Sequence, residues 1–233
     1  MIEALNLVNA ASYGADIDQV ILVVAILGGF WFLAAEFVFF GFILKYRAGS
    51  DENRKALYIA GEKDSETRWV TIPHLLVLVC DVFIIVAAVR VWFMVKQDVP
   101  PVDNHVRVVA QQWAWTFIHP GPDGKLDTED DIAVNDELHL PVDAVTSLEM
   151  VSRDVMHSFS VPVFRLKQDI IPGRVIMGWV QPTMTGEWDL QCVEMCGIGH
   201  GLMPARVFVE SPKDHAAWIA ENSSTTVAAV TVD

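Results

Sequence analysis

Basic residues and cysteines are scarce in this sequence. Its 16 lysines and arginines are outnumbered by 30 aspartates and glutamates, and the net charge of −14 argues against nucleic acid as a partner. Three cysteines allow at most one internal disulfide bond, and no Cys-x-x-Cys-His motif offers covalent haem attachment. No internal repeat occurs, which excludes a solenoid. The 233 residues therefore make one or two ordinary domains with enough mass for a core.

Charge is also nearly absent from two long stretches. Glu36 is the only charged residue in Val20–Leu44, and Asp81 and Arg90 are the only ones in Val70–Val95. Each stretch exceeds the roughly 20 residues with which a helix crosses a hydrocarbon core of about 30 Å. Two buried helices of a soluble bundle are the alternative, but such helices seldom remain apolar on every face over this length. We therefore expect two membrane spans, with Glu36 and Asp81 facing protein rather than lipid.

The distribution of basic residues predicts the orientation of these spans. Residues 1–19 contain no lysine or arginine, whereas the loop at residues 45–69 contains Lys45, Arg47, Arg54, Lys55, Lys63 and Arg68. By the positive-inside rule this loop is cytoplasmic, so both ends of the chain lie outside. A cleaved signal peptide would have a basic start and a shorter apolar stretch. We expect an external segment at residues 1–19 and a transmembrane hairpin at residues 20–96, in the lipid of a bacterial inner (plasma) membrane.

The sequence after the second span predicts a domain of β-strands. A polar, proline-bearing linker at residues 97–104 is followed by short β-branched or aromatic segments separated by proline, glycine and aspartate turns. The predicted strands are HVRVVAQQWAWTFI, ELHLP, AVTSLEMVS, RVIMGWVQP, GEWDLQC and ARVFVE. This pattern indicates an all-β sandwich or barrel over residues 105–211. Within residues 212–233, the segment PKDHAAWIAEN predicts a short C-terminal helix before a polar tail.

The segment CVEMCGIGHGLM holds the densest group of potential metal ligands. Cys192, Cys196, His200 and Met203 all lie within these twelve residues. In an oxidising outer compartment, two cysteines usually form a disulfide bond, although a Cys-x3-Cys loop is short for a relaxed one. Two cysteines and two histidines would also suit a closed tetrahedral zinc site. Copper is the third possibility, because electron-transfer copper sites combine thiolate and imidazole with a weak thioether ligand.

The methionine favours copper among these possibilities, because zinc sites do not use a thioether. A turn with cysteine, histidine and methionine at this spacing between two strands is typical of a cupredoxin copper loop. His157 in DVMHSFSVP is well placed to supply the remaining ligand. One copper needs one thiolate, whereas two thiolates in one loop can bridge two coppers that share an electron. Such sharing would change each bond little during electron transfer, which makes the transfer fast.

Two segments resemble one known family. DVMHSFSVPVFRLKQDIIPGR, at residues 154–174, and the CVEMCGIGHGLM segment resemble subunit II of the haem–copper cytochrome c oxidases, which carries a binuclear copper A centre. The resemblance also covers the two-span hairpin, the aromatic QQWAW stretch and the β domain. It implies a two-helix transmembrane hairpin followed by an all-β cupredoxin-like domain, a Greek-key sandwich or barrel.

The resemblance implies ligand roles for six residues at a centre of two copper ions. The bridging thiolates would be Cys192 and Cys196, and the further ligands would be His157, His200, Met203 and the main-chain carbonyl of Glu194. The side chain of Glu194 would point toward a magnesium ion shared with the large catalytic subunit. Without the resemblance, Glu194 would be interpreted as an ordinary exposed carboxylate.

Three further residues receive roles from the resemblance. Trp113 would be the surface tryptophan where the electron from cytochrome c enters, although by itself it would be interpreted as a half-buried strand aromatic. The family usually has Trp-Tyr-Trp here, and this chain has Ala114 in the middle. Asp154 is the candidate for docking a basic donor, against the alternative that acidic residues only keep the domain soluble. Glu66 would lie at the entrance of a proton-uptake route, against the alternative of a helix-start carboxylate.

An acidic insertion, PGPDGKLDTEDD at residues 120–131, interrupts the β domain. Asp123, Asp127 and Asp130 surround a glycine turn in the way of a calcium loop, because calcium prefers carboxylate and carbonyl oxygens. The leading Asp-x-Asp half of such a loop is missing. A solvated acidic hairpin is the alternative.

Together these features predict an oxidoreductase subunit that is not catalytic alone. The resemblance implies that it accepts electrons from cytochrome c and passes them to haem in subunit I, where oxygen is reduced to water and protons are pumped. Subunit III would be a further partner. The alternatives are a copper-relay subunit of a nitrogen-oxide reductase, a copper-free structural subunit of the quinol-oxidase type, and a binding domain stabilised by zinc or a disulfide bond.

Overall fold

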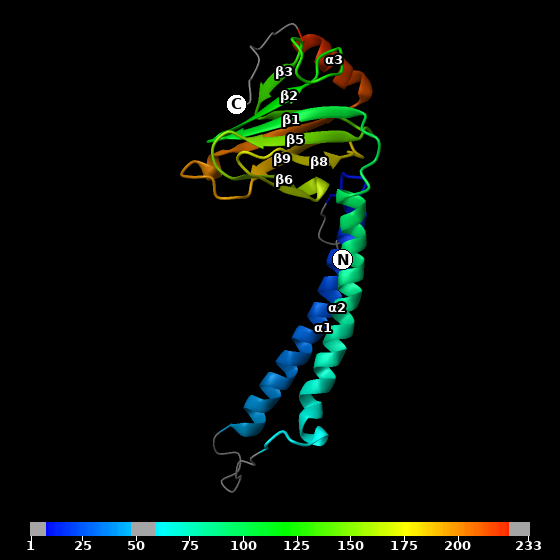
Figure 1. The fold of residues 1–233 in the computed structure, drawn as a ribbon, viewed down its shortest axis with the longest axis vertical. Helices are drawn as coiled ribbons and strands as arrows, with labels where there is room; N and C mark the ends of the chain where they lie inside the picture. The colour runs from blue at the N-terminus through cyan, green and yellow to red at the C-terminus, as the bar shows by residue number, and fades with distance from the viewer. Residues whose placement is uncertain (1–7, 48–58, 224–233) are drawn as a thin grey trace. The chain divides into compact units, whose positions relative to one another are not determined.

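The chain is divided into two compact units. The computed structural model describes residues 8–47 and 59–223. One unit, Asp16–Phe93, is helical, and the other combines Met94–Asp233 with the short segment Met1–Ala15. Figure 1 shows the two long helices and the layered β domain. Each unit is described by itself below.

The helical unit consists of two helices of 33 residues each, α1 (Gly14–Tyr46) and α2 (Asp64–Lys96). Both extend beyond the predicted apolar stretches, because acidic residues in their first turns and lysines in their last turns favour helix ends. Both are long and apolar enough to cross a membrane, and none of their most apolar windows is buried in the described chain. This exposure argues against the alternative of core helices in a soluble bundle.

The β domain is a sandwich of two five-stranded sheets, which confirms the predicted fold class. The first sheet has the order β3 (Ile132–Asn135), β2 (Ala114–His119), β1 (Asn104–Gln111), β5 (Thr146–Ser152) and β8 (Ile176–Val180). The second has the order β4 (Glu137–Pro141), β10 (Pro204–Glu210), β9 (Gly186–Cys192), β6 (His157–Val161) and β7 (Leu166–Ile170). Neighbouring strands are antiparallel except for β1 with β5 and β10 with β4, which run parallel.

The predicted strand HVRVVAQQWAWTFI is in fact two strands. The chain reverses at Gln112 and Trp113, so that Gln111 at the end of β1 pairs with Ala114 at the start of β2. The alternating pattern continues through the reversal, and it therefore conceals the turn from sequence inspection. Strands β3, β6 and β7 are also absent from the predicted segments, because each has only four or five residues and β7 carries three polar ones in LKQDI.

Large side chains from both sheets form the core of the β domain. Trp115, Phe117, Leu148, Phe159 and Leu190 are fully buried. In β10, buried and more accessible residues alternate, as expected for a strand with one face on the core. Burial of each such side chain contributes about 1.5–3 kcal/mol, so the sheets form a firm support for the loops at their ends.

A segment before α1 also packs on the β domain, a contact that the sequence did not predict. The Ala10 amide donates to the Val163 carbonyl at 2.9 Å, and the Ser12 amide donates to the Gln181 carbonyl at 3.1 Å. Tyr13 is buried and its hydroxyl donates to the Trp179 carbonyl at 3.3 Å. Burial raises the pKa of Tyr13 well above its usual value. The start of the described chain is thus part of the β unit.

A short helix, α3 (Pro212–Asn222), completes the β domain. The Ser211 side chain caps it by accepting a hydrogen bond from the Asp214 amide at 3.2 Å, and Pro212 occupies the first turn. Trp218 of α3 stacks on His139 of β4 with ring centroids 4.1 Å apart, and its ring also meets His119 of β2 edge-on. Aromatic contacts therefore hold α3 against β4 and β2.

Candidate metal centre

The candidate metal centre lies where two strands of the second sheet meet a loop. Strand β9 ends at Cys192, and residues 193–203 connect it to β10. Strand β6 begins at His157 and runs antiparallel to β9, with Phe159 opposite Cys192. This pairing brings His157 to the start of the loop, although the two lie far apart in the sequence.

Three buried side chains form the inner part of the centre. The ligand atoms of His157, Cys192 and Cys196 all lie within 4.8 Å of one another, and in the described part of the chain this is the one such group of histidine, cysteine and acidic residues. The Cys192 Sγ lies 3.9 Å from His157 Nδ1 and 3.9 Å from Cys196 Sγ. Such spacing leaves room for metal ions between the groups.

Further donor atoms converge on the two sulfurs. Cys196 Sγ lies 3.5 Å from His200 Nδ1 and 3.9 Å from Met203 Sδ. The Cys192 thiol donates to the Glu194 carbonyl at 3.3 Å. The structure therefore brings all six predicted ligand residues together, and each sulfur has its own imidazole and its own weak donor.

The geometry separates the three interpretations of the cysteines. Cys192 and Cys196 are free thiols whose sulfurs are 3.9 Å apart, well beyond the S–S bond length of about 2.05 Å. A closed zinc site would be complete with two cysteines and two histidines. The additional convergence of the Met203 thioether and the Glu194 carbonyl suits copper, which accepts weak axial ligands of this kind.

Burial changes the acidity of Cys196. Burial of Cys196, together with its closeness to Cys192, raises the pKa of the Cys196 thiol to about 11. Without a metal this thiol is protonated at neutral pH. Metal binding must therefore displace a proton here, as is usual for thiolate ligands.

The QQWAW stretch fixes the loop from the other sheet. Gln112 Nε2 donates to the Cys196 carbonyl at 2.7 Å, and Trp115 Nε1 donates to the Met203 carbonyl at 3.0 Å. Neither of these positioning contacts was predicted from the sequence. The sequence does show hydrogen-bond donors on either side of Trp113, in the side chains of Gln112 and Trp115. Only the folded structure shows that they donate to carbonyls of the loop.

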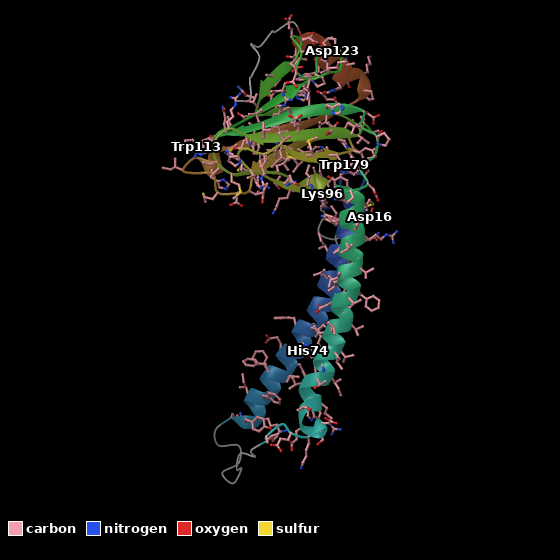
Figure 2. All side chains as sticks on the ribbon, viewed as in Figure 1. Asp16, His74, Lys96, Trp113, Asp123 and Trp179 are labelled. Carbon is pink, nitrogen blue, oxygen red and sulfur yellow. The ribbon has the colours of Figure 1, made fainter. Side chains whose placement is uncertain are left out.

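Trp113 lies on the loop and also reaches the surface. A Cβ atom added at Gly199 would come within 2.4 Å of the Trp113 ring, so the ring rests directly on loop backbone. Gly197, with φ +124°, approaches the same ring and the Gln112 side chain. Trp113 is 39% exposed, and Figure 2 shows it at one end of the β domain. It is therefore in contact with both the metal loop and the solvent.

Asp154 contacts His157, one of the predicted metal ligands, directly. Its carboxylate accepts hydrogen bonds of 2.6 Å from the Gln112 and Val155 amides, and its Oδ1 lies 2.9 Å from His157 Nε2. A His157 tautomer with Nε2–H facing this carboxylate leaves Nδ1 free toward Cys192. Burial alone would raise the pKa of Asp154, but the bonds from His157 and the two amides outweigh burial and lower it. Asp154 thus orients His157.

An exposed apolar surface surrounds the centre. The loop side chains Met195, Ile198 and Leu202 are 72, 94 and 82% exposed. Clustered apolar side chains of this size on a soluble domain usually mark a contact with another protein. The surface above the metal centre is therefore suited to a partner.

Glu66 lies in the helical unit, at the start of α2. Its Oε2 accepts a hydrogen bond from the Gly61 amide at 3.1 Å, and its own amide donates to the Lys63 carbonyl at 2.8 Å. These bonds are those of a helix-start carboxylate. The proton-uptake role of Glu66 stays a prediction.

The carboxylates of the acidic insertion are engaged within the protein. Asp127 forms a two-pronged pair with Arg107 at 2.6 and 3.0 Å, and Arg107 also contacts Glu149 at 2.7 Å. Asp130 accepts from the Thr128 hydroxyl at 2.6 Å and from the Asp123 amide at 3.2 Å. These contacts are those of an acidic hairpin anchored to β1. Calcium binding at Asp123, Asp127 and Asp130 stays a prediction.

One protein family matches the β domain. Residues 104–211 match the family described as "Cytochrome C oxidase subunit II, periplasmic domain". The chain is similar to the "Alternative cytochrome c oxidase subunit 2" of Bradyrhizobium diazoefficiens, with 36% identity over 148 residues, covering 54% of this chain and 53% of the relative. It is also similar to the "Probable cytochrome c oxidase subunit 2" of Rickettsia bellii, with 31% identity over 171 residues, covering 68% of this chain and 62% of the relative.

A solved structure matches the same region. The periplasmic domain of subunit II of cytochrome oxidase of Bradyrhizobium japonicum is similar with 26% identity and a TM-score of 0.50, covering 55% of this chain and 99% of that one. The matches to the full-length relatives are less complete. The chain spans about half the length of the Bradyrhizobium diazoefficiens relative and 36% of a relative from Thermostichus vulcanus to which it is 40% identical.

Proposed function

We propose that this chain is the electron-accepting subunit of a haem–copper oxidase, because residues 104–211 match the family of cytochrome c oxidase subunit II periplasmic domains. The observation that carries the proposal is the convergence of four donor groups on the sulfurs of Cys192 and Cys196, with distances of 3.3–3.9 Å to and between the two sulfurs. Donor sets of thiolate, imidazole, thioether and carbonyl are those of copper electron-transfer sites.

The residues present fit a pair of copper ions. His157, Cys192, Cys196, His200, Met203 and the Glu194 carbonyl would hold them, with the two thiolates shared. When bound, the copper ions would supply one-electron redox chemistry. The chain's own residues keep the ligands in place: Asp154 orients His157, and Gln112 and Trp115 bind the loop carbonyls. Burial of the sulfurs excludes water, so little has to reorganise when the charge changes.

Electrons would reach the centre through Trp113 from cytochrome c. The Trp113 ring touches the metal loop on one side and solvent on the other. The net charge of −14 would attract a basic donor, and the exposed apolar loop side chains would complete the contact. Asp154 is partly exposed, with 29% of its side chain accessible, and would contribute to docking as well as to the orientation of His157.

The chain would act in a membrane complex with subunits I and III. Electrons would pass to haem in subunit I, where oxygen is reduced to water and protons are pumped. Both the segment before α1 and the β domain would lie on one side of the membrane, and their packing in one compact unit supports this arrangement, since two crossings return the chain to the side on which it starts. The basic loop between the helices then faces the cytoplasm. Magnesium at the Glu194 side chain, proton uptake at Glu66 and calcium in the acidic insertion would be further features.

The proposal is tested on the full chain, purified in detergent, reduced and loaded with copper. Electron paramagnetic resonance of the coloured product should show one unpaired electron split by two equivalent copper nuclei. Cys196→Ser should give the spectrum of a single copper, because it removes one bridging sulfur. The control is Gly201→Ala in the same loop, which adds a Cβ in open space and should retain the pair. A colourless protein that binds only zinc, or one with Cys192 and Cys196 joined by a disulfide after reduction, would overturn the proposal.

A further inference from the structure

Three histidines lie where α3 packs on the β domain. The ring of His139 in β4 stacks on Phe208 of β10 and on Trp218 of α3, with centroids 4.8 and 4.1 Å away. His119 of β2 meets the Trp218 ring edge-on at 4.9 Å, and the ring of His215 in α3 stacks on the same tryptophan at 6.0 Å. We call His119, His139 and His215 the histidine cluster. It joins one helix and two strands through a single tryptophan.

Two members of the cluster share one carboxylate. Glu210, the last residue of β10, contacts His139 Nδ1 through Oε1 at 2.9 Å and His215 Nδ1 through Oε2 at 3.1 Å. Glu137 Oε2 lies 3.7 Å from the other ring nitrogen of His139. A nearby carboxylate favours the protonated form of an imidazole. His139 and His215 can therefore take up a proton while α3 stays in place.

His119 differs from the other two members. It is fully buried, and neither of its ring nitrogens has a hydrogen-bond partner among the described residues. Burial lowers the pKa of His119 well below its usual value, and the nearby His139 and His215 lower it further. A protonated imidazole carries a charge and two N–H donors, which are costly to bury without acceptors. His119 can therefore hold a proton only after its ring reaches water.

The ionisable residues around the cluster do not relieve this cost. Those of the elements that contact β2, β4 or α3, apart from the cluster itself, are His105 and Arg107 in β1, Asp131 directly before β3, Glu137 in β4, Arg206 and Glu210 in β10, and Lys213, Asp214 and Glu221 in α3. None of them is a hydrogen-bond partner of His119 in the described structure. Protonation of Glu210 or Glu137 would remove a negative charge from the cluster, so further acid does not compensate.

Helix α3 is the part of the β domain that opens most readily. It has 11 residues, none of them buried, and it belongs to neither sheet, so its release breaks no strand pairing. Local opening of such an element needs less free energy than unfolding of the sheets. Release of α3 removes Trp218, the ring that meets His119 edge-on, and thereby opens a path from His119 to water.

We propose that α3 is an acid-sensitive latch, which lies on β4 and β10 at neutral pH and opens as a unit when His119 takes up a proton. The proton binds the open state in preference to the closed one, so acid shifts the population toward the open state. Opening exposes the rings of Phe208 and His139, which Trp218 and its helix otherwise cover. Acid thus creates an aromatic surface on this side of the sandwich.

Hydrogen–deuterium exchange of the full chain in detergent, followed by mass spectrometry, tests the latch. The protection of each peptide is the intrinsic exchange rate of an unstructured peptide at the same pH divided by the measured rate, so the effect of pH on exchange chemistry cancels. Residues 212–222 report on α3, and residues 204–210 report on the neighbouring strand β10. The two peptides distinguish opening of the helix from unfolding of the sheet.

The size of the expected change follows from the titration of one histidine. Once α3 is open, His119 has the ordinary pKa of about 6.5, so opening is about tenfold more frequent at pH 5.5 than at pH 7.5. The closed state is therefore fully favoured above pH 6.5 and loses its advantage as the pH falls below it. Protection of residues 212–222 should fall about tenfold between pH 7.5 and 5.5, whereas protection of residues 204–210 should change much less.

Three variants assign the effect to the cluster. His119→Phe removes the titrating group but retains a ring of similar size, and it should make the protection of α3 independent of pH. The matched control is His105→Asn, which changes an exposed histidine of β1 and should retain the tenfold fall. Trp218→Ala removes the ring that covers His119, so α3 should be open already at pH 7.5 while β10 stays protected.

Several results would overturn the latch. These are an α3 that is unprotected at pH 7.5, a protection of α3 that does not change with pH, an equal loss of protection in α3 and β10, and a tenfold fall that persists in His119→Phe. If His119→Phe does not fold, Trp218→Ala decides, because a closed α3 at pH 7.5 in that variant contradicts the inference.

The latch is independent of the proposed copper relay, because the cluster shares no residue with the candidate metal centre. The copper spectrum of the same samples separates the two. A two-copper spectrum with an α3 that ignores pH overturns the latch alone. Acid opening of α3 in a chain that binds no copper overturns the relay and supports the latch.

Discussion

At the scale of single residues, the packing of the loop at residues 193–203 depends on the absence of a side chain at Gly199. The Trp113 ring occupies the position that a Cβ atom would take there. Replacement of Gly199 must therefore move either the ring or the loop backbone that carries the ligands. Gly199 therefore links the packing of the Trp113 ring to the position of the neighbouring His200.

We predict that Gly199→Ala destabilises the domain by about 1–3 kcal/mol, the usual cost of overpacking. It should also lower the copper content after reconstitution, because Cys196 and His200 flank the displaced backbone. Thermal unfolding and metal analysis measure the two effects. Gly201→Ala, which meets no atom within 4 Å, should be nearly neutral in both measurements. Equal behaviour of the two variants would show that Trp113 does not restrain the loop.

Asp154 has two predicted roles that a single substitution can separate. Asp154→Asn removes the charge that faces His157 Nε2 and retains one side-chain oxygen, which can accept from one of the two backbone amides that now donate to different carboxylate oxygens. Loss of a carboxylate behind a histidine ligand commonly weakens metal binding by about 10–100-fold. We expect a decrease of this size in copper affinity, measured by competition with a chelator.

The control for this prediction is Asp189→Asn, which removes an exposed acid that pairs with Arg206. This variant should leave copper affinity unchanged, because exposed pairs contribute little and Asp189 does not contact the metal loop. If Asp154→Asn changes only the salt dependence of the reaction with the donor, Asp154 serves docking alone.

At the scale of elements, α3 is joined to the sandwich by a buried histidine cluster. His119 is fully buried and neither ring nitrogen has a hydrogen-bond partner in the described structure. Burial lowers the pKa of His119 well below its usual value, and the nearby His139 and His215 lower it further. Burial also lowers the pKa of His215, against the opposing effect of Glu210, whose carboxylate contacts both His139 and His215.

These shifts predict that the domain is less stable in acid. The folded pKa of His119 lies below the unfolded value of about 6.5, so below that pH the unfolded state binds the additional proton. The stability contributed by neutral His119 is therefore complete above pH 6.5 and is lost as the pH falls below it, by at most about 1.4 kcal/mol per pH unit.

Thermal unfolding followed by tryptophan fluorescence between pH 7.5 and 5 measures this dependence. His119→Phe removes the titrating group and should flatten the decrease in melting temperature. His105→Asn changes an exposed histidine of β1 and should leave the decrease as it is in the original chain. A His119→Phe variant with an unaltered pH profile would exclude His119 as the origin of the effect.

Features that are encoded in one continuous stretch of residues could be predicted from the sequence. The two long helices follow from continuous apolar runs, and four of the residues that converge at the candidate metal centre lie within twelve positions of the sequence. The contacts of Gln112, Trp115 and Asp154 could not be predicted, because they depend on how strands distant in sequence are paired. The turn at Gln112 and Trp113 was hidden for a similar reason, since alternation continues across it.

At the scale of the whole molecule, the large negative charge determines how fast a donor arrives. The net charge of −14 creates a long-range field that attracts basic proteins. We predict that the bimolecular rate of reduction of the copper-loaded chain by a basic cytochrome c falls about tenfold or more between 10 and 200 mM salt. Stopped-flow absorbance measures this rate. An acidic cytochrome should react slowly at low salt and faster as salt is added. A rate with the basic donor that does not depend on salt would contradict electrostatic steering.

The packing of residues 8–13 on the β domain also sets an order of events during biosynthesis. Ala10 and Ser12 emerge from the ribosome before either long helix, yet their partners Val163 and Gln181 are made after both. In the proposed topology, the segment would be exported first and would wait with its amides unpaired until the remainder of the β domain had followed it across the membrane. Formation of these hydrogen bonds would then report that the two ends of the hairpin are in the same compartment.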